Sequence, residues 1–304
     1  MLRYLTNLAP ALLTAAFTLA PMPAAHAQSQ GMMLATLNPT PVIQQDVARL
    51  HTLGADMVRF PVYFSYEPSV TVWLDKADAV LATCESRNVT CVVDFHHPTP
   101  GHFNSDIVDV NDFVAKWQAF AQRFQSRTRI WYDLCNEPNH PQWRSVALQA
   151  AQAIRAIDPV HKIVFAPRGT TTAPATTFNP LAGITNQVLQ FHFYNWPDVQ
   201  LHPYSPAGDT QVTAYPSPGR TGTDLDALLN AVRDAGLRTG LPVLIGEVAI
   251  SREHPNAGRF LRDFAAKCRA RNIKLIIHAY READIWNYEL NPNAWTQITN
   301  WLAL

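Results

Sequence analysis

Glutamate is scarce in this chain, at 7 of its 304 residues, and no long block of like charges occurs along the sequence. Basic and acidic residues are equal in number, at 24 each. Proteins that bind nucleic acid or another polyanion normally carry a surplus of Lys and Arg on one face or segment. The balance gives no support to such a partner, and we expect no nucleic-acid binding.

Long apolar runs are missing as well, since no segment after the N-terminus reaches the ~18 apolar residues of a membrane-spanning helix. The first 27 residues have the features of a signal peptide: Arg3, an apolar stretch over residues 8–20 and the small-residue sequence Ala25-His26-Ala27. We expect cleavage there, a secreted or periplasmic protein free of the membrane, and one catalytic domain over residues 28–304. The alternative is a retained N-terminal anchor.

Cysteine occurs at four positions, and their spacing fits no zinc-binding pattern. An exported protein meets conditions in which disulfides are stable. Cys84 and Cys91 flank a predicted turn between a helix and a strand, so they could be bridged. Cys135 and Cys268 lie in apolar patterns and are expected to be buried thiols. No cofactor is expected.

Short aliphatic runs alternate with amphipathic helical patterns from Gly31 onward. The predicted strands are residues 32–37, 57–62, 90–95, 130–134, 162–166, 188–193, 242–247 and 273–279. Apolar strands separated by helices form parallel sheets that are buried on both faces, and eight repeats predict a single closed (β/α)8 TIM barrel. An open doubly wound sheet is the alternative, but the Gly-rich nucleotide turn that it needs is absent. The fifth helix is the weakest, because residues 169–180 are rich in Thr, Ala and Pro.

Two of the seven glutamates end strongly apolar strands. Glu137 closes the run that begins at Trp131, and Pro138 prevents the strand from continuing. Glu247 follows Gly246 at the end of a second aliphatic run. The carboxyl ends of barrel strands meet at one face, where active sites are built. We therefore expect both carboxylates to face one crater.

Further polar side chains are predicted at the same strand ends, namely Arg59, His96, His97, Asn136, His192 and Tyr194. Two carboxylates on separate strands suit glycoside hydrolysis. In that reaction one group protonates the leaving oxygen, and the other attacks the anomeric carbon or activates water. The strand ends therefore indicate a carbohydrate-cleaving site.

The motifs at these positions resemble those of glycoside hydrolase family 5, part of the retaining (β/α)8 clan that includes many bacterial cellulases. The similarity covers about Gly31 to the C-terminus. Its most specific part is Leu134-Cys135-Asn136-Glu137-Pro138, which is similar to the family's Asn-Glu-Pro signature. The other matching motifs are Val58-Arg59-Phe60-Pro61, Asp94-Phe95-His96-His97, His192-Phe193-Tyr194 and Ile245-Gly246-Glu247.

The resemblance implies that Glu137 is the acid/base and Glu247 the nucleophile of a double displacement. Residues that bind the substrate or support the site would be Arg59, His96, Asn136, His192 and Tyr194. It implies a monomeric hydrolase of β-linked polysaccharide or oligosaccharide, most directly an endo-β-1,4-glucanase, without a metal. The alternatives are a catalytically degenerate carbohydrate-binding barrel, a β-mannanase or exo-β-glucosidase of the same clan, and a metal-dependent barrel hydrolase.

Family 5 usually places a sugar-stacking Trp at the end of strand eight, where this chain reads Ile276-Ile277-His278-Ala279-Tyr280. Either Trp286 or Tyr280 could provide the platform. Trp196 is a second expected platform, because sugar rings present apolar C–H faces to aromatic planes. Other aromatic side chains near strand ends and loops are expected mainly to pack: Tyr63, Tyr66, Trp143, Tyr204 and Tyr288.

Structural roles compete with these functional ones. Glu137 could serve only as an anion at the N-terminus of the next helix, and His96 could be an ordinary buried histidine. Arg59 could form a salt bridge with a barrel carboxylate such as Asp94, a role compatible with its functional one. Asp94 and Asp133 are rival acids but are expected to be hydrogen-bonding groups of the barrel interior.

His97 is expected to be structural or to line the rim, because neighbouring strand residues point in opposite directions. The same divergence disfavours a metal site built from His96, His97 and His102. A retaining mechanism predicts a separation of about 5–5.5 Å between the carboxyl groups of Glu137 and Glu247. We expect Arg59 and Tyr194 to approach Glu247, and His192 and Asn136 to lie nearer Glu137.

Overall fold

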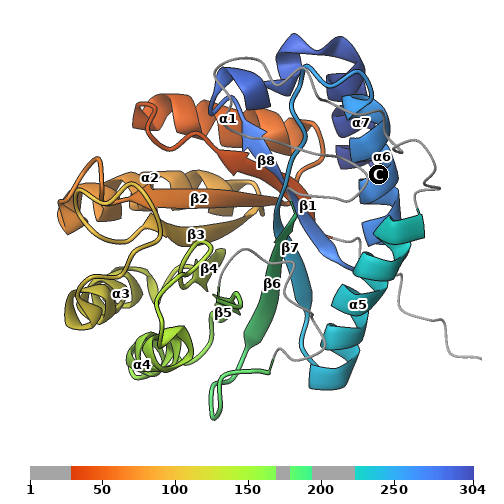
Figure 1. Cartoon of the computed structure of the whole chain (residues 1–304). Helices are drawn as coiled ribbons and strands as arrows, with labels where there is room; N and C mark the ends of the chain where they lie inside the picture. Colours follow the sequence, from red (N-terminus) through yellow and green to blue (C-terminus); the bar gives the residue numbers. More distant parts are fainter. Residues whose placement is uncertain (1–28, 169–178, 194–222) are drawn as a thin grey trace, which may run out of the picture.

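The computed structural model describes residues 29–168, 179–193 and 223–304. Eight parallel strands close into a barrel in sequence order, with β1 pairing to both β2 and β8 (Figure 1). The strands are β1 (Gln30–Leu34), β2 (Met57–Tyr63), β3 (Thr90–His97), β4 (Ile130–Asp133), β5 (Lys162–Phe165), β6 (Gln187–Phe193), β7 (Val243–Val248) and β8 (Lys274–Tyr280). The predicted (β/α)8 barrel is thus confirmed.

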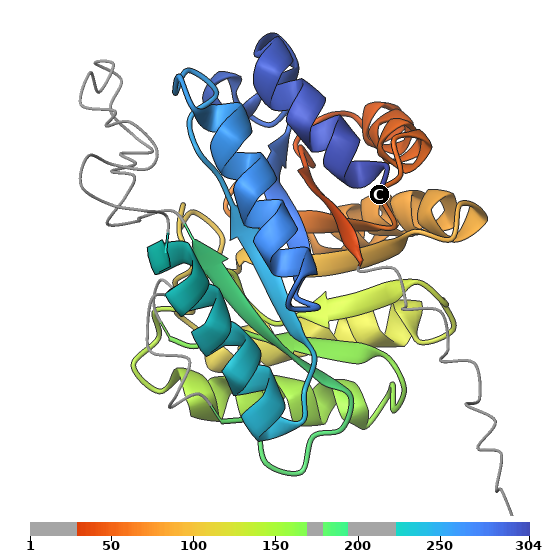
Figure 2. The ribbon, with the colours of Figure 1, turned by 90° about the vertical axis from the view of Figure 1, so that its right-hand side faces the viewer.

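Helices surround the barrel, and Figure 2 shows α5 and α6 running along the outside of the strands. The helices are α1 (Thr40–Thr52), α2 (Val70–Ser86), α3 (Val110–Phe124), α4 (Trp143–Arg155), α5 (Thr223–Thr239), α6 (Ala257–Arg269) and α7 (Pro292–Leu302), with short 3-10 turns η2 (Asp284–Trp286) and η3 (Tyr288–Leu290). The weak fifth helix expected over residues 169–180 falls mostly outside the described residues.

The predicted strand boundaries agree with the structure to within two residues, except at the end of β1. That strand ends at Leu34 rather than at residue 37. The chain turns there, since Thr36 donates its backbone N–H to the Leu34 carbonyl at 3.1 Å and its hydroxyl to the Pro61 carbonyl. These bonds satisfy the local polar groups without further strand pairing.

The barrel has two apolar cores. A small cluster fills its interior: Met33, Met57, Val92, Val164, Val188, Leu244, Ile276 and Ala279. A much larger cluster lies between the strands and the helices. In α3, for example, Phe113, Trp117, Phe120 and Phe124 are all buried, as their helical spacing predicts. The polar site must therefore lie above the interior cluster, at one end of the barrel.

All four cysteines are buried and free, so the bridge considered for Cys84 and Cys91 is not formed. A hydrogen bond with the Cys84 thiol and burial together raise the pKa of Cys91 well above its usual value. Burial likewise raises the pKa of Cys135 and of Cys268. Protonated, buried thiols are chemically inert packing groups.

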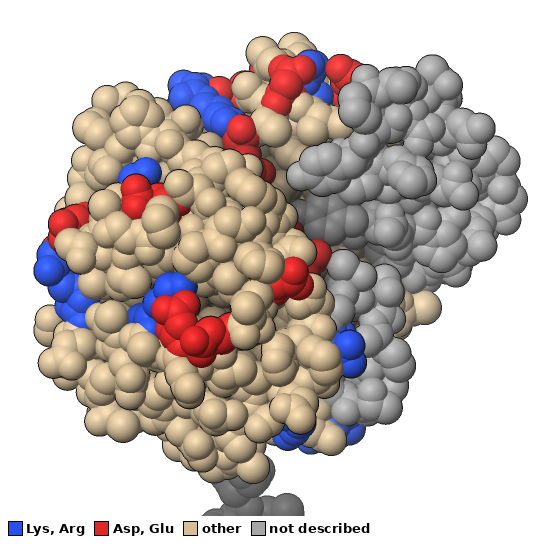
Figure 3. Space-filling view, turned by 60° about the vertical axis from the view of Figure 1, so that its left-hand side comes forward, with Lys and Arg blue, Asp and Glu red and all other residues tan. Residues whose placement is uncertain are grey.

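On the surface drawn in Figure 3, acidic and basic side chains of the described residues lie close together in small groups, with no extended basic patch. Gln30 at the start of β1 donates its side-chain amide to the Leu302 carbonyl at 2.9 Å, which ties the first strand to the last helix. None of the described helices combines the length and apolar character needed to cross a membrane.

Candidate active site

The polar crater at the carboxyl ends of the strands is formed by inward-pointing side chains, which alternate with outward-pointing ones along each strand. In β2, Met57 belongs to the interior cluster, and Arg59 points inward two residues later. In β8, Ile276 belongs to that cluster, and His278 follows two residues later. Inward positions therefore change from apolar to ionisable side chains toward the carboxyl ends of the strands.

Arg59 is the fully buried centre of this layer. Its Nε donates to Asp133 Oδ2 at 3.0 Å, and its Nη2 lies 3.3 Å from Asp94 Oδ2. Nη2 also donates to Asn136 Oδ1 at 3.1 Å, and Nη1 donates to Glu247 Oε1. Burial opposes the charge, but the three carboxylates raise the pKa of Arg59 above its usual value. The salt bridge considered for Arg59 is thus formed, and the same guanidinium contacts Glu247 and Asn136.

Asp94 and Asp133 are both fully buried against Arg59, as expected for groups of the barrel interior. Burial raises the pKa of Asp133 to about 6, even though Arg59 acts in the opposite direction. Neither carboxyl is accessible to a substrate, so neither can protonate a glycosidic oxygen. They fix the guanidinium that holds Glu247.

Glu247 is a buried carboxylate surrounded by cationic or potentially cationic groups. Burial opposes its ionisation, but the charges of His192, Arg59 and His278 hold its pKa far below the usual value. Glu247 is therefore ionised throughout the range in which the protein would work. An ionised, positioned carboxylate is the form that a nucleophile requires.

Glu137 is more open, with 24% of its side chain exposed, and its backbone has a φ of 35°. That left-handed conformation is unfavourable for a residue with a side chain, so it must be imposed by the surroundings. One such restraint is Trp117 of α3, whose indole donates to the Leu134 carbonyl at 3.0 Å. The end of β4 is therefore held in the geometry that presents Glu137 to the crater.

His192 joins the two glutamates. Its Nδ1 lies 3.1 Å from Glu137 Oε1 and 3.7 Å from Glu247 Oε2. A register shift after Phe191 brings His192 opposite Glu247 in the β6–β7 pair. One ligand atom from each of Glu137, His192 and Glu247 lies within 4.8 Å of the others. The two carboxylates are thus close neighbours in one crater.

His96 and Asn136 form the wall beside Arg59. Asn136 Nδ2 lies 3.2 Å from His96 Nε2, while His96 Nδ1 lies 3.3 Å from Asp94 Oδ2. Burial disfavours protonation of His96, but the Asp94 carboxylate outweighs burial and raises the pKa of this imidazole. Through its Oδ1, Asn136 also accepts a hydrogen bond from Arg59, so this amide links His96 to the guanidinium that holds Glu247.

Two expected sugar platforms offer no open aromatic face. Trp286 is 6% exposed and lies edge-on to His278, with ring centroids 5.5 Å apart. Tyr280 is 1% exposed and stacks on Trp295 at 5.8 Å. Trp286 therefore contacts His278 with its ring edge, and Tyr280 packs against Trp295. Tyr194, Trp196 and Tyr204 lie outside the described residues.

Sequence reasoning missed a chain of polar groups at the end of β8. His278 Nδ1 lies 3.7 Å from Glu247 Oε2, and its Nε2 lies 3.0 Å from Glu282 Oε2. Tyr63 at the end of β2 donates its hydroxyl to Glu282 Oε1 at 2.8 Å. The missed signal was alternation, since His278 and Tyr63 continue the inward positions set by Ile276 and Arg59.

The histidine cluster considered for a metal is not assembled. His97 Nδ1 lies 2.7 Å from Ser65 Oγ, and His102 Nδ1 lies 3.5 Å from Asp106 Oδ2, so these rings serve separate partners. In the described part of the chain, the group that could hold an ion is Glu137, His192 and Glu247. Arg59 already places a permanent cation on Glu247, which disfavours a second cation there.

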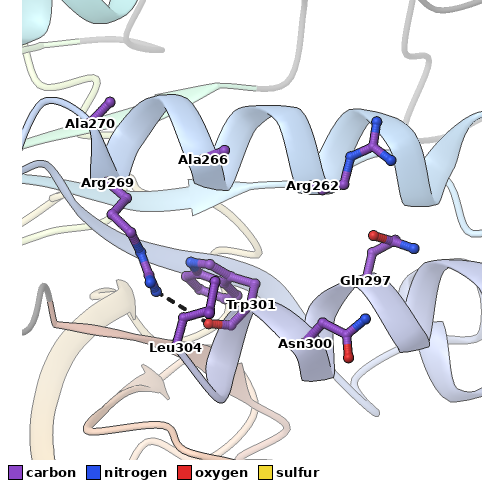
Figure 4. A pocket seen from close by; sticks show the side chains of 8 residues that line it. All are labelled: Arg262, Ala266, Arg269, Ala270, Gln297, Asn300, Trp301 and Leu304. Carbon is purple, nitrogen blue, oxygen red and sulfur yellow. Dashed lines mark hydrogen bonds between the residues drawn. The ribbon is translucent and has the colours of Figure 1, made fainter.

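A separate cavity of about 540 Å³ lies between α6 and α7 (Figure 4). Its lining residues are Arg262, Ala266, Arg269, Ala270, Gln297, Asn300, Trp301 and Leu304. None of these side chains is a carboxylic acid, and none belongs to the strand-end residues. This cavity therefore lacks the carboxyl pair that glycoside cleavage needs.

Comparison with known proteins agrees with this arrangement. The sequence matches Cellulase (glycosyl hydrolase family 5) over residues 20–291. Endoglucanase E-5 of Thermobifida fusca is 30% identical over 155 residues, which covers 46% of this chain and 32% of that protein. Endoglucanase CelA of Streptomyces lividans is 27% identical over 153 residues, with the same coverage. The match thus spans about a third of the length of these relatives.

Solved structures share the fold. The cellulose synthase subunit Z of Clostridioides difficile has a TM-score of 0.74 at 19% identity, covering 91% of this chain and 100% of that one. Cel5A of Thermotoga maritima, solved with mannotriose, has a TM-score of 0.72 at 16% identity, covering 90% and 97%. The family match extends over most of the sequence, and the structure has the barrel that the family shares. This chain therefore belongs to glycosyl hydrolase family 5.

Proposed function

We propose that the chain is a secreted or periplasmic, monomeric, retaining endo-β-1,4-glucanase that uses Glu247 as the nucleophile and Glu137 as the acid/base. The observation that carries the proposal is the proximity of these two carboxylates in contrasting environments. Oxygens of the two groups approach within 4.8 Å. A retaining pair is expected at about 5–5.5 Å, whereas an inverting pair leaves about 6.5–9.5 Å for a water molecule.

The nucleophile is assigned to Glu247 because it is buried, ionised and positioned. Arg59 donates to one of its oxygens, and His192 and His278 lie within 3.7 Å of the other. These contacts fix the carboxylate, which then attacks the anomeric carbon and forms the glycosyl-enzyme ester. When the ester is hydrolysed, Arg59 and the two imidazoles stabilise the carboxylate that departs.

The acid/base is assigned to Glu137 because it is the more exposed of the two and contacts no arginine in the described structure. In the first step it would protonate the departing glycosidic oxygen, and in the second it would deprotonate the incoming water. His192 Nδ1, at 3.1 Å from Glu137 Oε1, can hold the carboxyl in place through both steps.

The substrate class rests on the relatives. The proteins named endoglucanase support a β-1,4-glucan. The solved complexes of Thermotoga maritima Cel5A with mannotriose and with cellobiose keep a β-mannanase or an exo-β-glucosidase of the same clan as the alternative. Export rests on the signal-peptide features of residues 1–27, which lie outside the described structure.

The proposal is tested by reducing-sugar release from purified mature protein on β-glucans, mannans and xylans, with Glu247→Gln as the matched control. We expect release from cellulosic or mixed-linkage β-glucan, and none from the control. Binding without release would instead identify a degenerate carbohydrate-binding barrel. Activity that a chelator abolishes and a divalent ion restores would favour a metal hydrolase built on Glu137, His192 and Glu247.

A further inference from the structure

Two aromatic side chains are exposed at the end of the barrel that holds the crater. Tyr66 lies in the loop between β2 and α2 and is 57% exposed, and Phe103 lies in the loop between β3 and α3 and is 62% exposed. Every other Phe, Tyr and Trp side chain that the structure describes is buried or half-buried. Adjacent exposed rings form an apolar patch, which is a candidate contact surface.

A series of contacts between rings connects Tyr66 and Phe103 with the predicted catalytic centre. His96, which contacts Asn136, has its ring centroid 4.9 Å from that of Tyr63. The Tyr63 and Tyr66 centroids are 6.0 Å apart, and the Tyr66 and Phe103 centroids are 5.0 Å apart. The His97 ring lies 5.0 Å from Tyr63 and 6.1 Å from Tyr66, at an interplanar angle of 28° to Tyr66. These ring contacts therefore place Tyr66 and Phe103 near the side of the crater formed by His96 and Asn136.

The rings at the rim form an uncharged corner. Tyr66 and Phe103 meet at an interplanar angle of 73°, so one ring can lie under a flat ligand while the other borders it. Burial and the neighbouring His96 lower the pKa of His97 to about 4, so His97 adds a neutral ring at neutral pH. Such a surface suits the C–H faces of a neutral sugar better than a charged ligand.

The loops that carry the two rings are held in place before any ligand binds. Thr99 donates its hydroxyl to the Asp106 carbonyl at 2.6 Å, and Asn139 donates its amide to Asp106 Oδ1 at 2.5 Å, which closes the loop around Phe103. Tyr66 donates its backbone N–H to the Tyr63 carbonyl at 3.1 Å. A preformed surface loses little conformational entropy on binding.

We propose that Tyr66 and Phe103 form an outlying sugar-binding subsite, over which a β-linked glucan chain continues from the catalytic centre toward the rim between β2 and β3. The inference rests on the proposed function and deepens it, because a subsite beyond the cleaved unit favours long chains over disaccharides. The enzyme would then act on polymers, with the crater open on this side.

The kinetic test compares cello-oligosaccharides of increasing length with a short aryl β-cellobioside. In the unaltered chain, kcat/KM should rise with length. Tyr66→Ala and Phe103→Ala should each remove roughly 3- to 10-fold of that rise and leave the aryl substrate unaffected. Tyr66→Phe should retain the rise. Val160→Ala, an exposed apolar position in the loop before β5, is the matched control and should change nothing.

A binding test separates this inference from the proposed function. Calorimetry measures the affinity of Glu247→Gln for cellobiose and cellohexaose, with and without the Tyr66→Ala and Phe103→Ala changes. We expect the advantage of cellohexaose to disappear when the rings are removed. An unchanged advantage, or an equal loss for the aryl substrate, would overturn the inference. Absence of hydrolysis by the unaltered chain would instead count against the proposed function, while the binding result would still decide the subsite.

Discussion

The imidazole of His278 lies 3.7 Å from the Glu247 carboxylate, at the strand end where the family carries a tryptophan. On its other side, Glu282 Oε2 lies 3.0 Å from Nε2. Burial disfavours the protonated ring, but Glu282 and Glu247 raise its pKa above the usual value. At this strand end, the chain therefore places an imidazole with a raised pKa beside Glu247, where the family carries an aromatic plane.

The His278–Glu282 pair should make stability depend on pH. Because the pKa of His278 is raised in the folded protein, its contribution to the free energy of unfolding is complete below the unfolded-state pKa of about 6.5. That contribution is lost as the pH rises through the folded-state pKa. Burial opposes ionisation of Glu282, but His278 lowers the pKa of this carboxyl. The stabilisation by Glu282 is therefore present above about pH 4.3, the unfolded-state pKa, and is lost in acid. The pair is thus strongest in mildly acidic solution.

Glu282→Gln should accordingly lower the free energy of unfolding by about 1–2 kcal/mol near pH 5.5 and by less near pH 9. Urea unfolding at the two pH values measures the difference. Glu253→Gln, whose side chain is 68% exposed, is the control for the change in net charge. The same loss at both pH values would show that the pair does not titrate as described.

Arg59 should set both stability and the acid limit of activity. Arg59→Ala leaves buried carboxylates without their partner and should cost about 3–5 kcal/mol of unfolding free energy. Arg59→Lys retains the charge but cannot donate to three partners from a planar fork. Because Arg59 lowers the pKa of Glu247, the acid limb of kcat/KM should move to higher pH in Arg59→Ala and move less in Arg59→Lys.

Pairing the pH profile with denaturant unfolding separates these effects for Arg59. A folded Arg59→Ala protein with an unmoved acid limb would mean that Glu247 does not depend on Arg59 for its ionisation. If Arg59→Ala does not fold, Arg59→Lys still tests the assignment, because loss of the fork should lower kcat without unfolding the protein.

The two glutamates should differ in how azide rescues their variants. Glu137→Ala should lose about 10²–10⁴-fold of its activity on natural glycans but still form the glycosyl-enzyme from aryl glycosides with good leaving groups. Azide needs no base, so it should accelerate turnover and give a β-glycosyl azide. In Glu247→Ala, azide would take the place of the missing carboxylate and attack from the face opposite the leaving group. The product would be an α-glycosyl azide.

Product configuration by NMR spectroscopy decides this assignment. Exchanged configurations between the two variants would mean that the roles of Glu137 and Glu247 are reversed. Equal and unrescued loss on aryl substrates would contradict a covalent intermediate.

The four cysteines should be inaccessible in the native protein, because all are buried and free. A thiol reagent should therefore react with none of them before unfolding and with all four in denaturant. Mass spectrometry of alkylated, unreduced protein provides an independent count. Two fewer reactive thiols after unfolding would reveal a bridge, with Cys84 and Cys91 as the adjacent candidates.

The barrel was predictable because the strands are mostly apolar and the helices have helical apolar spacing. The strand-end residues followed from that fold, and the structure brings Arg59, His96, Asn136, Glu137, His192 and Glu247 to one crater. Such predictions need only the order of the elements and the rule that the carboxyl ends of barrel strands share one face.

Contacts across the crater were not predictable in the same way. Glu282 meets Tyr63 from a loop more than two hundred residues away in the sequence, and no local pattern encodes that meeting. The pattern predicts a sugar platform at Trp286, but in the structure this ring is buried and lies edge-on to His278. Side-chain burial in loops depends on tertiary packing, which a one-dimensional pattern does not specify.

The stereochemistry of hydrolysis tests the central claim most directly, because it reports on the double displacement by Glu247 and Glu137 without any mutation. NMR spectra recorded during the first minutes of cello-oligosaccharide cleavage identify the anomer that forms before mutarotation. Two successive inversions predict that the β-anomer appears first and the α-anomer follows only by equilibration. Initial appearance of the α-anomer would mean a single displacement by water and would contradict the covalent role of Glu247.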